Sequence, residues 1–296
     1  AQAEQSVKMF VFVLLHQAIE QYAKGVGEKL KTEWAKIQGR FEEIPFMESA
    51  EQTLRVVAAS IKQKPFDSNS EHIINQSIEQ AVRVLAQEEL LPSAMDVNDA
   101  VRLFRKVYPM HPLTALILPN LCQLISQNER SLFSYISSQE HSGFKDMLAR
   151  LHQAGDFIRP DHIFDYFIQN QTSIGGDYLT QRRWAESVSA IDRLSSVTEN
   201  EMRVLKAIGV INVLGSRGNI RASEPVISLV YGESVAGVLQ SLLGRSAIVF
   251  RKFNRAYKVW EGSDFDLETE LNDEIHRLGP FSLAEKLTKE KSLTPI

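Results

Sequence analysis

Arg130 is the residue whose type and position best fit chemistry, because it stands where one helical pattern gives way to the next. Apolar residues at helical spacing run through residues 115–125 and resume at Leu132, with the polar segment 127–130 between them. The start of a helix favours acids, so an arginine there needs another explanation. A guanidinium can donate two hydrogen bonds to an anion, such as the terminal phosphate of a nucleotide. The alternative is an exposed arginine, or one paired with Glu129.

A second group of charges lies near the C-terminus, where five cations fall within a span that contains no acid. Residues 247–253 and 255–260 are rich in β-formers on either side of Asn254, which predicts a hairpin. A basic hairpin can lie along a phosphate backbone, although five cations predict weak, salt-sensitive binding. The alternatives are a solvated hairpin, or one that packs on its own neighbouring domain or on a partner. The cations are Arg245, Arg251, Lys252, Arg255 and Lys258.

Polar residues follow a candidate strand near the N-terminus. Residues 8–15 form a short apolar run rich in Val and Phe, typical of a central strand covered on both faces. His16 and Gln17 end this run, and ligands bind at the carboxyl ends of strands in open α/β sheets. A helix start that needs polar groups explains the same two residues equally well.

Arg40 comes directly before a second, shorter candidate strand. Residues 41–46 contain Pro45, which cannot donate to a ladder and therefore predicts an edge position. The simpler interpretation of Arg40 is a surface arginine next to Glu42 and Glu43.

The composition bounds the class of protein. The chain has 296 residues, 44% hydrophobic and 24% charged, which predicts a globular protein of about two domains. A net charge of -4 argues against nucleic-acid binding over the whole surface and leaves room for one basic patch. The single cysteine, Cys122, predicts a buried thiol and excludes a disulfide within the chain. The apolar run 9–15 is too short for a bilayer, so we expect a cytoplasmic chain with no membrane partner.

The elements that must position these residues are mostly helical. Asp96 predicts an N-cap before residues 97–107, and residues 198–201 resemble a capping box. The best internal linker is 173–178, which contains two glycines. Beyond it, a helix, a short strand at 219–222, helices at 225–231 and 235–243 and the hairpin follow the order of a winged helix. Helices are also expected at 51–61, 73–85, 144–152, 161–169 and 180–194.

Common enzyme motifs are absent from the sequence. There is no Gly-x-x-x-x-Gly-Lys-Ser/Thr phosphate loop, no Gly-x-Ser-x-Gly elbow and no His-Glu-x-x-His. The histidines His141, His152 and His162 lie in one region but lack metal-ligand spacing, so no metal site is predicted.

The order of these parts resembles the C-terminal half of AAA+ ATPases, the Orc/Cdc6-like ATPases in particular. Residues 38–42, Gln-Gly-Arg-Phe-Glu, are similar to the Gly-Arg-Phe-Asp segment that carries arginine fingers, and residues 127–130 look like a sensor-2 segment. His16 and Gln17 fall where sensor 1 would be, where Asn, Ser or Thr is more usual. Residues 34–46, 111–114 and 127–133 also look like segments of large prokaryotic P-loop ATPases, some from phage-defence or DNA-metabolism loci.

The resemblance implies roles for these residues. Arg130 would approach the γ-phosphate of its own subunit, and Arg40 the nucleotide of a neighbour in a homo-oligomer, where an arginine stabilises charge on the transferring phosphoryl group. It also implies a parent protein that binds ATP and Mg, with the Walker A and Walker B motifs in an upstream P-loop half before Ala1. This segment should then bind no nucleotide tightly and should not hydrolyse ATP alone.

We therefore expect a mainly α fold that retains remnant strands of an α/β AAA+ core. The expected domains are the core remnant at 1–46, a helical lid at 47–175, a winged helix at 176–263 and an acidic helix and tail at 264–296. Two other functions fit the sequence. One is a non-enzymatic winged-helix module that binds double-stranded DNA or a protein, and the other is a structural helical adaptor.

Overall fold

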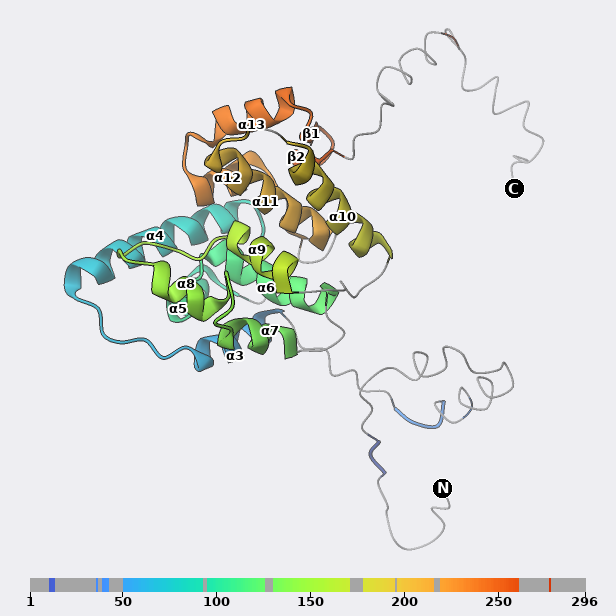
Figure 1. Ribbon diagram of the computed structural model, residues 1–296. Coiled ribbons are helices and arrows are strands. Elements are labelled where there is room, and N and C mark those ends of the chain that lie inside the picture. The colour runs from blue at the N-terminus through green and yellow to red at the C-terminus, as the bar shows by residue number, and fades with distance from the viewer. Residues whose placement is uncertain are drawn as a thin grey trace, which may run out of the picture. The chain divides into compact units, whose positions relative to one another are not determined.

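The computed structural model describes residues 11–13, 36, 39–42, 50–92, 95–125, 130–170, 178–194, 196–215, 219–260 and 277. The chain divides into two units, Ala1–Glu48 and Ser49–Ile296. Every helix and strand named below belongs to the second unit (Figure 1).

The described residues of the first unit correct one expectation. Val11, Phe12 and Val13 form no strand and are 52%, 85% and 59% exposed, so the buried central strand predicted for 8–15 is wrong at these three residues. An apolar run becomes a central strand only where neighbouring strands and helices cover it. Phe41 and Glu42 are also exposed and outside any strand. The remainder of both predicted strands lies outside the described residues.

The fold is mainly α, as predicted, and its described part holds eleven helices and one two-stranded sheet. The helices are α3 (Ala50–Ser60), α4 (Ser68–Gln87), α5 (Val97–Val107), α6 (Pro112–Ile125), α7 (Arg130–Ser137), α8 (Phe144–Arg150), α9 (Pro160–Asn170), α10 (Tyr178–Arg193), α11 (Glu199–Leu214), α12 (Glu224–Tyr231) and α13 (Val235–Gly244). The strands are β1 (Ile248–Arg251) and β2 (Ala256–Val259).

Two helix starts confirm caps predicted from sequence. The Asp96 carboxylate accepts a hydrogen bond from the Asp99 N–H at 2.8 Å at the start of α5. At the start of α11 the Thr198 N–H donates to the Glu201 carboxylate at 2.7 Å, and the Glu201 N–H donates to the Thr198 hydroxyl at 3.2 Å. This capping box fixes where the central helix begins.

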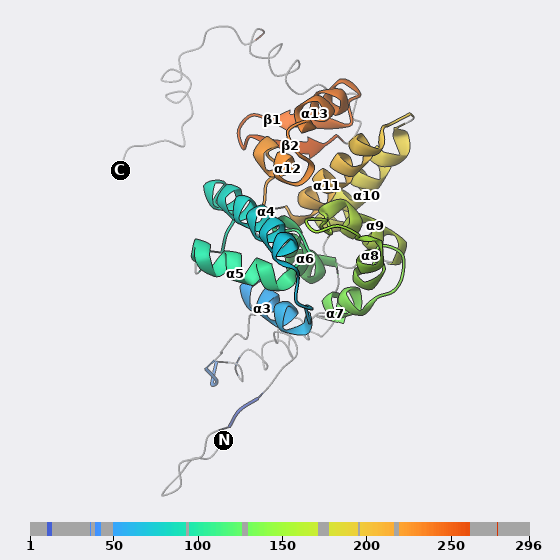
Figure 2. The same cartoon turned by 90° about the vertical axis from the view of Figure 1, so that its left-hand side faces the viewer.

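Helix α11 is the centre of the hydrophobic core. Every position from 204 to 214 is buried except Lys206 and Asn212, and a helix that is apolar on nearly all sides needs neighbours all round. Figures 1 and 2 show α11 in the middle of the unit, with α9 below it and α12 and α13 above. Helices from the expected lid and from the expected winged helix therefore pack around one core.

Polar contacts also join these two groups of helices. The Tyr231 hydroxyl, at the end of α12, donates to the buried Asp161 carboxylate of α9 at 2.7 Å. The Ser223 hydroxyl, which precedes α12, donates to Glu88 at the end of α4 at 2.8 Å. Helix α12 is thus held at both ends by the helices before residue 171.

The predicted hairpin is confirmed, in a shorter form. Strands β1 and β2 are antiparallel, with Ile248 opposite Val259 and Arg251 opposite Ala256. The short strand predicted for 219–222 is wrong, because only one backbone bond joins it to the hairpin, from the Tyr257 N–H to the Ala222 carbonyl at 2.9 Å.

Apart from that single bond, the side chain of Asn212 provides hydrogen-bond partners for backbone groups at the outer edge of β2. Its amide nitrogen donates to the Tyr257 carbonyl at 3.2 Å, and its oxygen accepts from the Val259 N–H at 2.9 Å. A side-chain amide from α11 therefore satisfies backbone groups that a third strand would otherwise pair.

Candidate functional site

The hairpin presents two different faces. Successive residues of a strand point to opposite sides, so Arg251 and Lys258 share one face while Phe250 and Tyr257 share the other. The rings of Phe250 and Tyr257 lie 5.1 Å apart between centroids. Tyr257 is buried. The hairpin therefore has an aromatic face that packs and a basic face that carries charge.

The tip of the hairpin is the most exposed part of the candidate site. Residues 252–255 form a turn in which Lys252, Phe253 and Arg255 are exposed, and Arg255 has a φ of 50°. Phe253 is 86% exposed. From the sequence, Phe253 was counted only as a β-former. Its position between Lys252 and Arg255, next to the predicted turn at Asn254, is the sequence signal that could have identified it as a candidate site residue.

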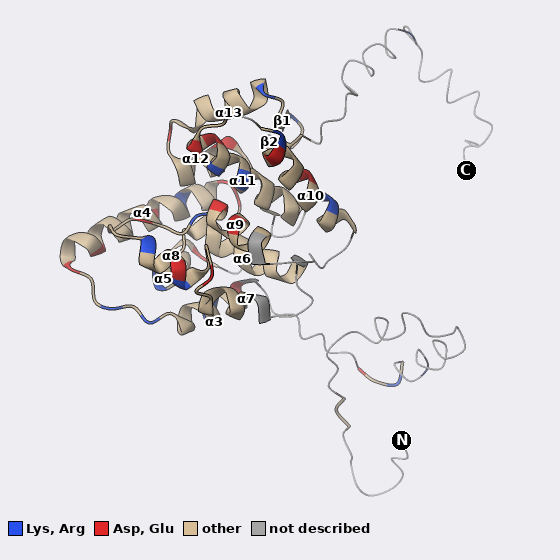
Figure 3. Cartoon of the chain, in the orientation of Figure 1, with Lys and Arg blue, Asp and Glu red and all other residues tan. Residues whose placement is uncertain are grey.

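Three of the hairpin cations have no acid beside them among the described residues. Arg251, Lys252 and Arg255 take part in none of the ion pairs found in the described part of the chain. Elsewhere acidic and basic residues alternate along the helices (Figure 3). The hairpin thus carries a local positive charge on a chain whose net charge is -4.

Arg245, which was also predicted to contact DNA, has a carboxylate beside it. Its Nε lies 3.6 Å from the carboxylate of Glu201, a buried residue of α11. The hydroxyl of Ser241 also donates to that carboxylate, and together with the Thr198 contacts and Arg245 it lowers the pKa of Glu201 to about 2. Arg245 therefore helps to tie the end of α13 to α11.

Helix α13 lacks the charge expected of a helix that reads DNA. In the winged-helix order the helix before the hairpin is the one placed in the major groove. Helix α13 contains no Lys or Arg, and Glu233 stands just before it. Its exposed positions include Ala236, Gly237 and Gln240. Of α13 and the hairpin, only the hairpin therefore offers cations that could contact a phosphate backbone.

The predicted nucleotide-contacting residues are only partly described. Arg130 is the first residue of α7, and both the segment 126–129 that precedes it and the surroundings of its side chain lie outside the described residues. Arg40 is exposed in a turn of the first unit. His16 and Gln17 lie outside the described residues.

His111, from the 111–114 segment, is a buried structural histidine. Its ring Nδ1 accepts a hydrogen bond from the Leu113 N–H at 3.2 Å. The backbone N–H of His111 donates to the Ile158 carbonyl at 3.0 Å. Burial, with a smaller contribution from the charge of Arg159, lowers the pKa of His111 to about 3. The neutral ring therefore helps to start α6.

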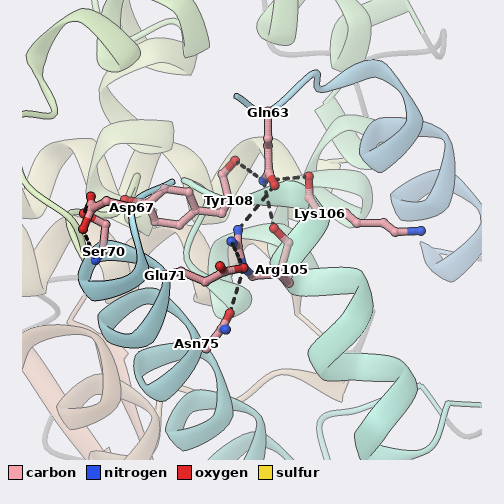
Figure 4. A network of polar contacts seen from close by, with 8 residues as sticks. All are labelled: Gln63, Asp67, Ser70, Glu71, Asn75, Arg105, Lys106 and Tyr108. Atoms are coloured by element: carbon pink, nitrogen blue, oxygen red, sulfur yellow. Dashed lines mark hydrogen bonds and ion pairs between the residues drawn. The ribbon is translucent and has the colours of Figure 1, made fainter. Parts of the chain in front are cut away.

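A network of polar contacts joins α4, α5 and the loop between α3 and α4 (Figure 4). The Arg105 guanidinium donates to Asn75 at 2.8 Å and lies over the ring of Phe66 at 5.0 Å. The Gln63 amide nitrogen caps the end of α5 and lies 2.8, 3.3 and 3.2 Å from the carbonyls of Arg105, Lys106 and Tyr108. These partners are more than 25 residues apart in sequence, so no local pattern predicted the network.

The groove between α3 and α5 is lined by charges that already have partners. Its volume is about 500 Å³, and Arg55, Arg102 and Lys106 line it. Arg55 pairs with Glu51 at 2.8 Å, and Arg102 pairs with Asp99. The groove therefore offers one lysine rather than a set of unmatched cations.

Other chemistry is not evident in the described residues. No described helix combines the length and apolar character that crossing a membrane requires. The described residues also contain no group of three or more His, Cys, Asp or Glu that could hold a metal ion. Cys122 is buried, as predicted, and burial raises the pKa of its thiol to about 12.

The chain was compared with protein-family models, with curated proteins and with solved structures, and none of the three comparisons found a match.

Proposed function

We propose that this chain is a nucleic-acid-binding module whose β1–β2 hairpin contacts the phosphate backbone. The observation that supports this best is the hairpin itself, where Arg251, Lys252 and Arg255 have no described carboxylate as a partner. Cations that contact phosphates release counter-ions from nucleic acid, and this release is the main source of sequence-independent affinity.

The geometry also sets the strength and the specificity of this binding. The hairpin offers about four cations, far fewer than a large DNA-binding surface, and α13 adds none. We therefore expect weak binding that decreases as salt rises and that depends little on sequence, because base edges are read by side chains placed in a groove.

Fluorescence anisotropy of a labelled DNA tests this proposal at low salt. We expect Lys252→Ala combined with Arg255→Ala to weaken binding about tenfold or more, since two phosphate contacts are lost. Lys145→Ala, at an exposed lysine on α8, is the matched control and should bind as the unaltered chain does. Equal affinity of the double variant and the control would overturn the proposal.

We also propose a second role, in which this chain is the lid and winged-helix part of an ATP-hydrolysing P-loop ATPase that acts on DNA. The specific observation in its favour is that α7 begins at Arg130, the residue that the resemblance identifies as a nucleotide-sensing arginine. An arginine at a helix start has no favourable interaction with the helix dipole. A nucleotide phosphate bound by the same protein would supply an anion for this guanidinium.

The second role is tested in the chain joined to the upstream P-loop half that the resemblance implies. Arg130→Ala should lower ATP turnover by about 10²-fold, the usual effect of losing one donor that stabilises transition-state charge. Arg150→Ala, which removes a surface arginine paired with Asp146 on α8, is the control. Unchanged turnover in Arg130→Ala would show that Arg130 has no such role.

A further inference from the structure

Phe253 is an aromatic side chain that the fold does not use. It is 86% exposed at the hairpin tip, whereas Phe250 packs its ring 5.1 Å from that of Tyr257. The register of β1 and β2 is already set by the pairs from Ile248 with Val259 to Arg251 with Ala256. Single exposed apolar side chains are common on protein surfaces, so the feature that points to a contact outside the chain is the position of this ring between two exposed cations at the hairpin tip.

The neighbours of Phe253 define the kind of partner that fits it. Lys252 directly precedes it and Arg255 follows two residues later, both exposed. An apolar pocket on another protein would accept the ring but would leave these cations without counter-charges. Nucleic acid offers both groups together, because each nucleotide carries a flat base beside a phosphate.

We propose that Phe253 stacks on an unpaired base while Lys252 and Arg255 contact the adjacent phosphates. The ligand class is single-stranded DNA, or DNA with unpaired bases at a junction or an opened duplex. This inference rests on the proposed nucleic-acid binding and names the form of DNA that the hairpin prefers.

The choice of unpaired over paired bases follows from the size of the site. A side chain wedged into a duplex must separate stacked bases, and proteins that do this wrap a large surface of bent DNA to offset the cost. Here α13 adds no cation, so the hairpin lacks such a surface. An unpaired base offers its face without that cost, and every base has such a face.

The experiment compares two labelled DNAs of equal strand length, a 12-nucleotide oligothymidine and a blunt-ended duplex of two complementary strands, by fluorescence anisotropy at low salt. The intact chain should bind the single strand more tightly than the duplex. Phe253→Ala should weaken single-strand binding about tenfold, which is the usual effect of removing one stacking aromatic. Phe253→Trp should keep the affinity, and the added tryptophan fluorescence should be quenched when the single strand binds.

Tyr178→Ala is the matched control, because Tyr178 is 75% exposed at the start of α10 and lies outside the hairpin. Circular dichroism should show that Phe253→Ala folds as the intact chain does, since its ring contributes little to the core. Equal binding of the single strand by Phe253→Ala and the intact chain would overturn the stacking role, as would a preference for the duplex. If Lys252→Ala still weakens binding in either case, the proposed nucleic-acid binding stands. If the intact chain binds neither DNA, both proposals fail.

Discussion

At the scale of single residues, surroundings decide what a charged or titratable side chain can do. His111 carries a ring that titrates near neutral pH in water, yet it is buried and its Nδ1 accepts the Leu113 N–H. Arg245 and Arg255 have equal charge, but Arg245 lies beside buried Glu201 while Arg255 is exposed at a turn. The five cations of the predicted hairpin site are therefore not equivalent.

Replacing His111 should change how stability depends on pH. The pKa of this histidine is about 6.5 when unfolded and about 3 when folded, so its stabilisation is present above pH 6.5 and is lost as pH falls toward 3. Linkage predicts that the free energy of unfolding falls by about 2 kcal/mol between pH 7 and pH 5 because of this residue. His111→Asn keeps an acceptor but cannot titrate, so it should lose about 2 kcal/mol less over this range.

Urea denaturation at pH 7 and pH 5 measures the difference between the two proteins. The same change at His72, which is exposed on α4, is the control and should leave the pH dependence unaltered. If the intact chain and His111→Asn lose equal stability between these pH values, His111 is not held neutral by burial.

At the scale of elements, the hairpin is held by a contact that is distant in sequence. Asn212 of α11 pairs with both Tyr257 and Val259 through its side-chain amide. Asn212→Ala leaves both backbone groups of β2 without these partners, so we expect the free energy of unfolding to fall by about 2 kcal/mol. Thermal or urea denaturation measures this loss. Gln240→Ala, at an exposed position of α13, should change stability by less than about 0.5 kcal/mol, and an equally small effect of Asn212→Ala would contradict the pairing.

The features that the sequence predicted correctly are those determined by residues close together in the chain. The caps at Asp96 and Thr198 and the β1–β2 hairpin were predictable, because the residues that determine them are neighbours in sequence. The strand at 219–222 was predicted wrongly, because an amide at Asn212, 45 residues before its partner Tyr257, takes its place. The cations of the hairpin were found from sequence, but the pairing of Arg245 and the exposure of Phe253 required the fold.

At the scale of the whole second unit, the helices share one core. Helix α11 contacts α6 and α9 on one side and α12 and α13 on the other. The bonds from Tyr231 to Asp161 and from Ser223 to Glu88 connect the same two groups of helices. A shared core predicts that these helices unfold together.

Unfolding of the chain should therefore show a single transition for its helices and its tertiary packing. Tyr231→Phe removes a hydrogen bond to a buried carboxylate and should lower the free energy of unfolding by about 1–3 kcal/mol, with one transition retained. Far-ultraviolet and near-ultraviolet circular dichroism should give coincident curves for both proteins. Two separate transitions in the unaltered chain would contradict a shared core.

The hairpin is a local positive site on a chain of net charge -4. The number of phosphate contacts that its cations make can therefore be measured. The most direct measurement is the slope of the logarithm of the binding constant against the logarithm of salt concentration, with single-stranded DNA. Three phosphate contacts, from Arg251, Lys252 and Arg255, predict a slope of about -2.1, and Lys252→Ala with Arg255→Ala should reduce it to about -0.7. An identical slope in the two proteins, or binding that salt leaves unchanged, would contradict the account.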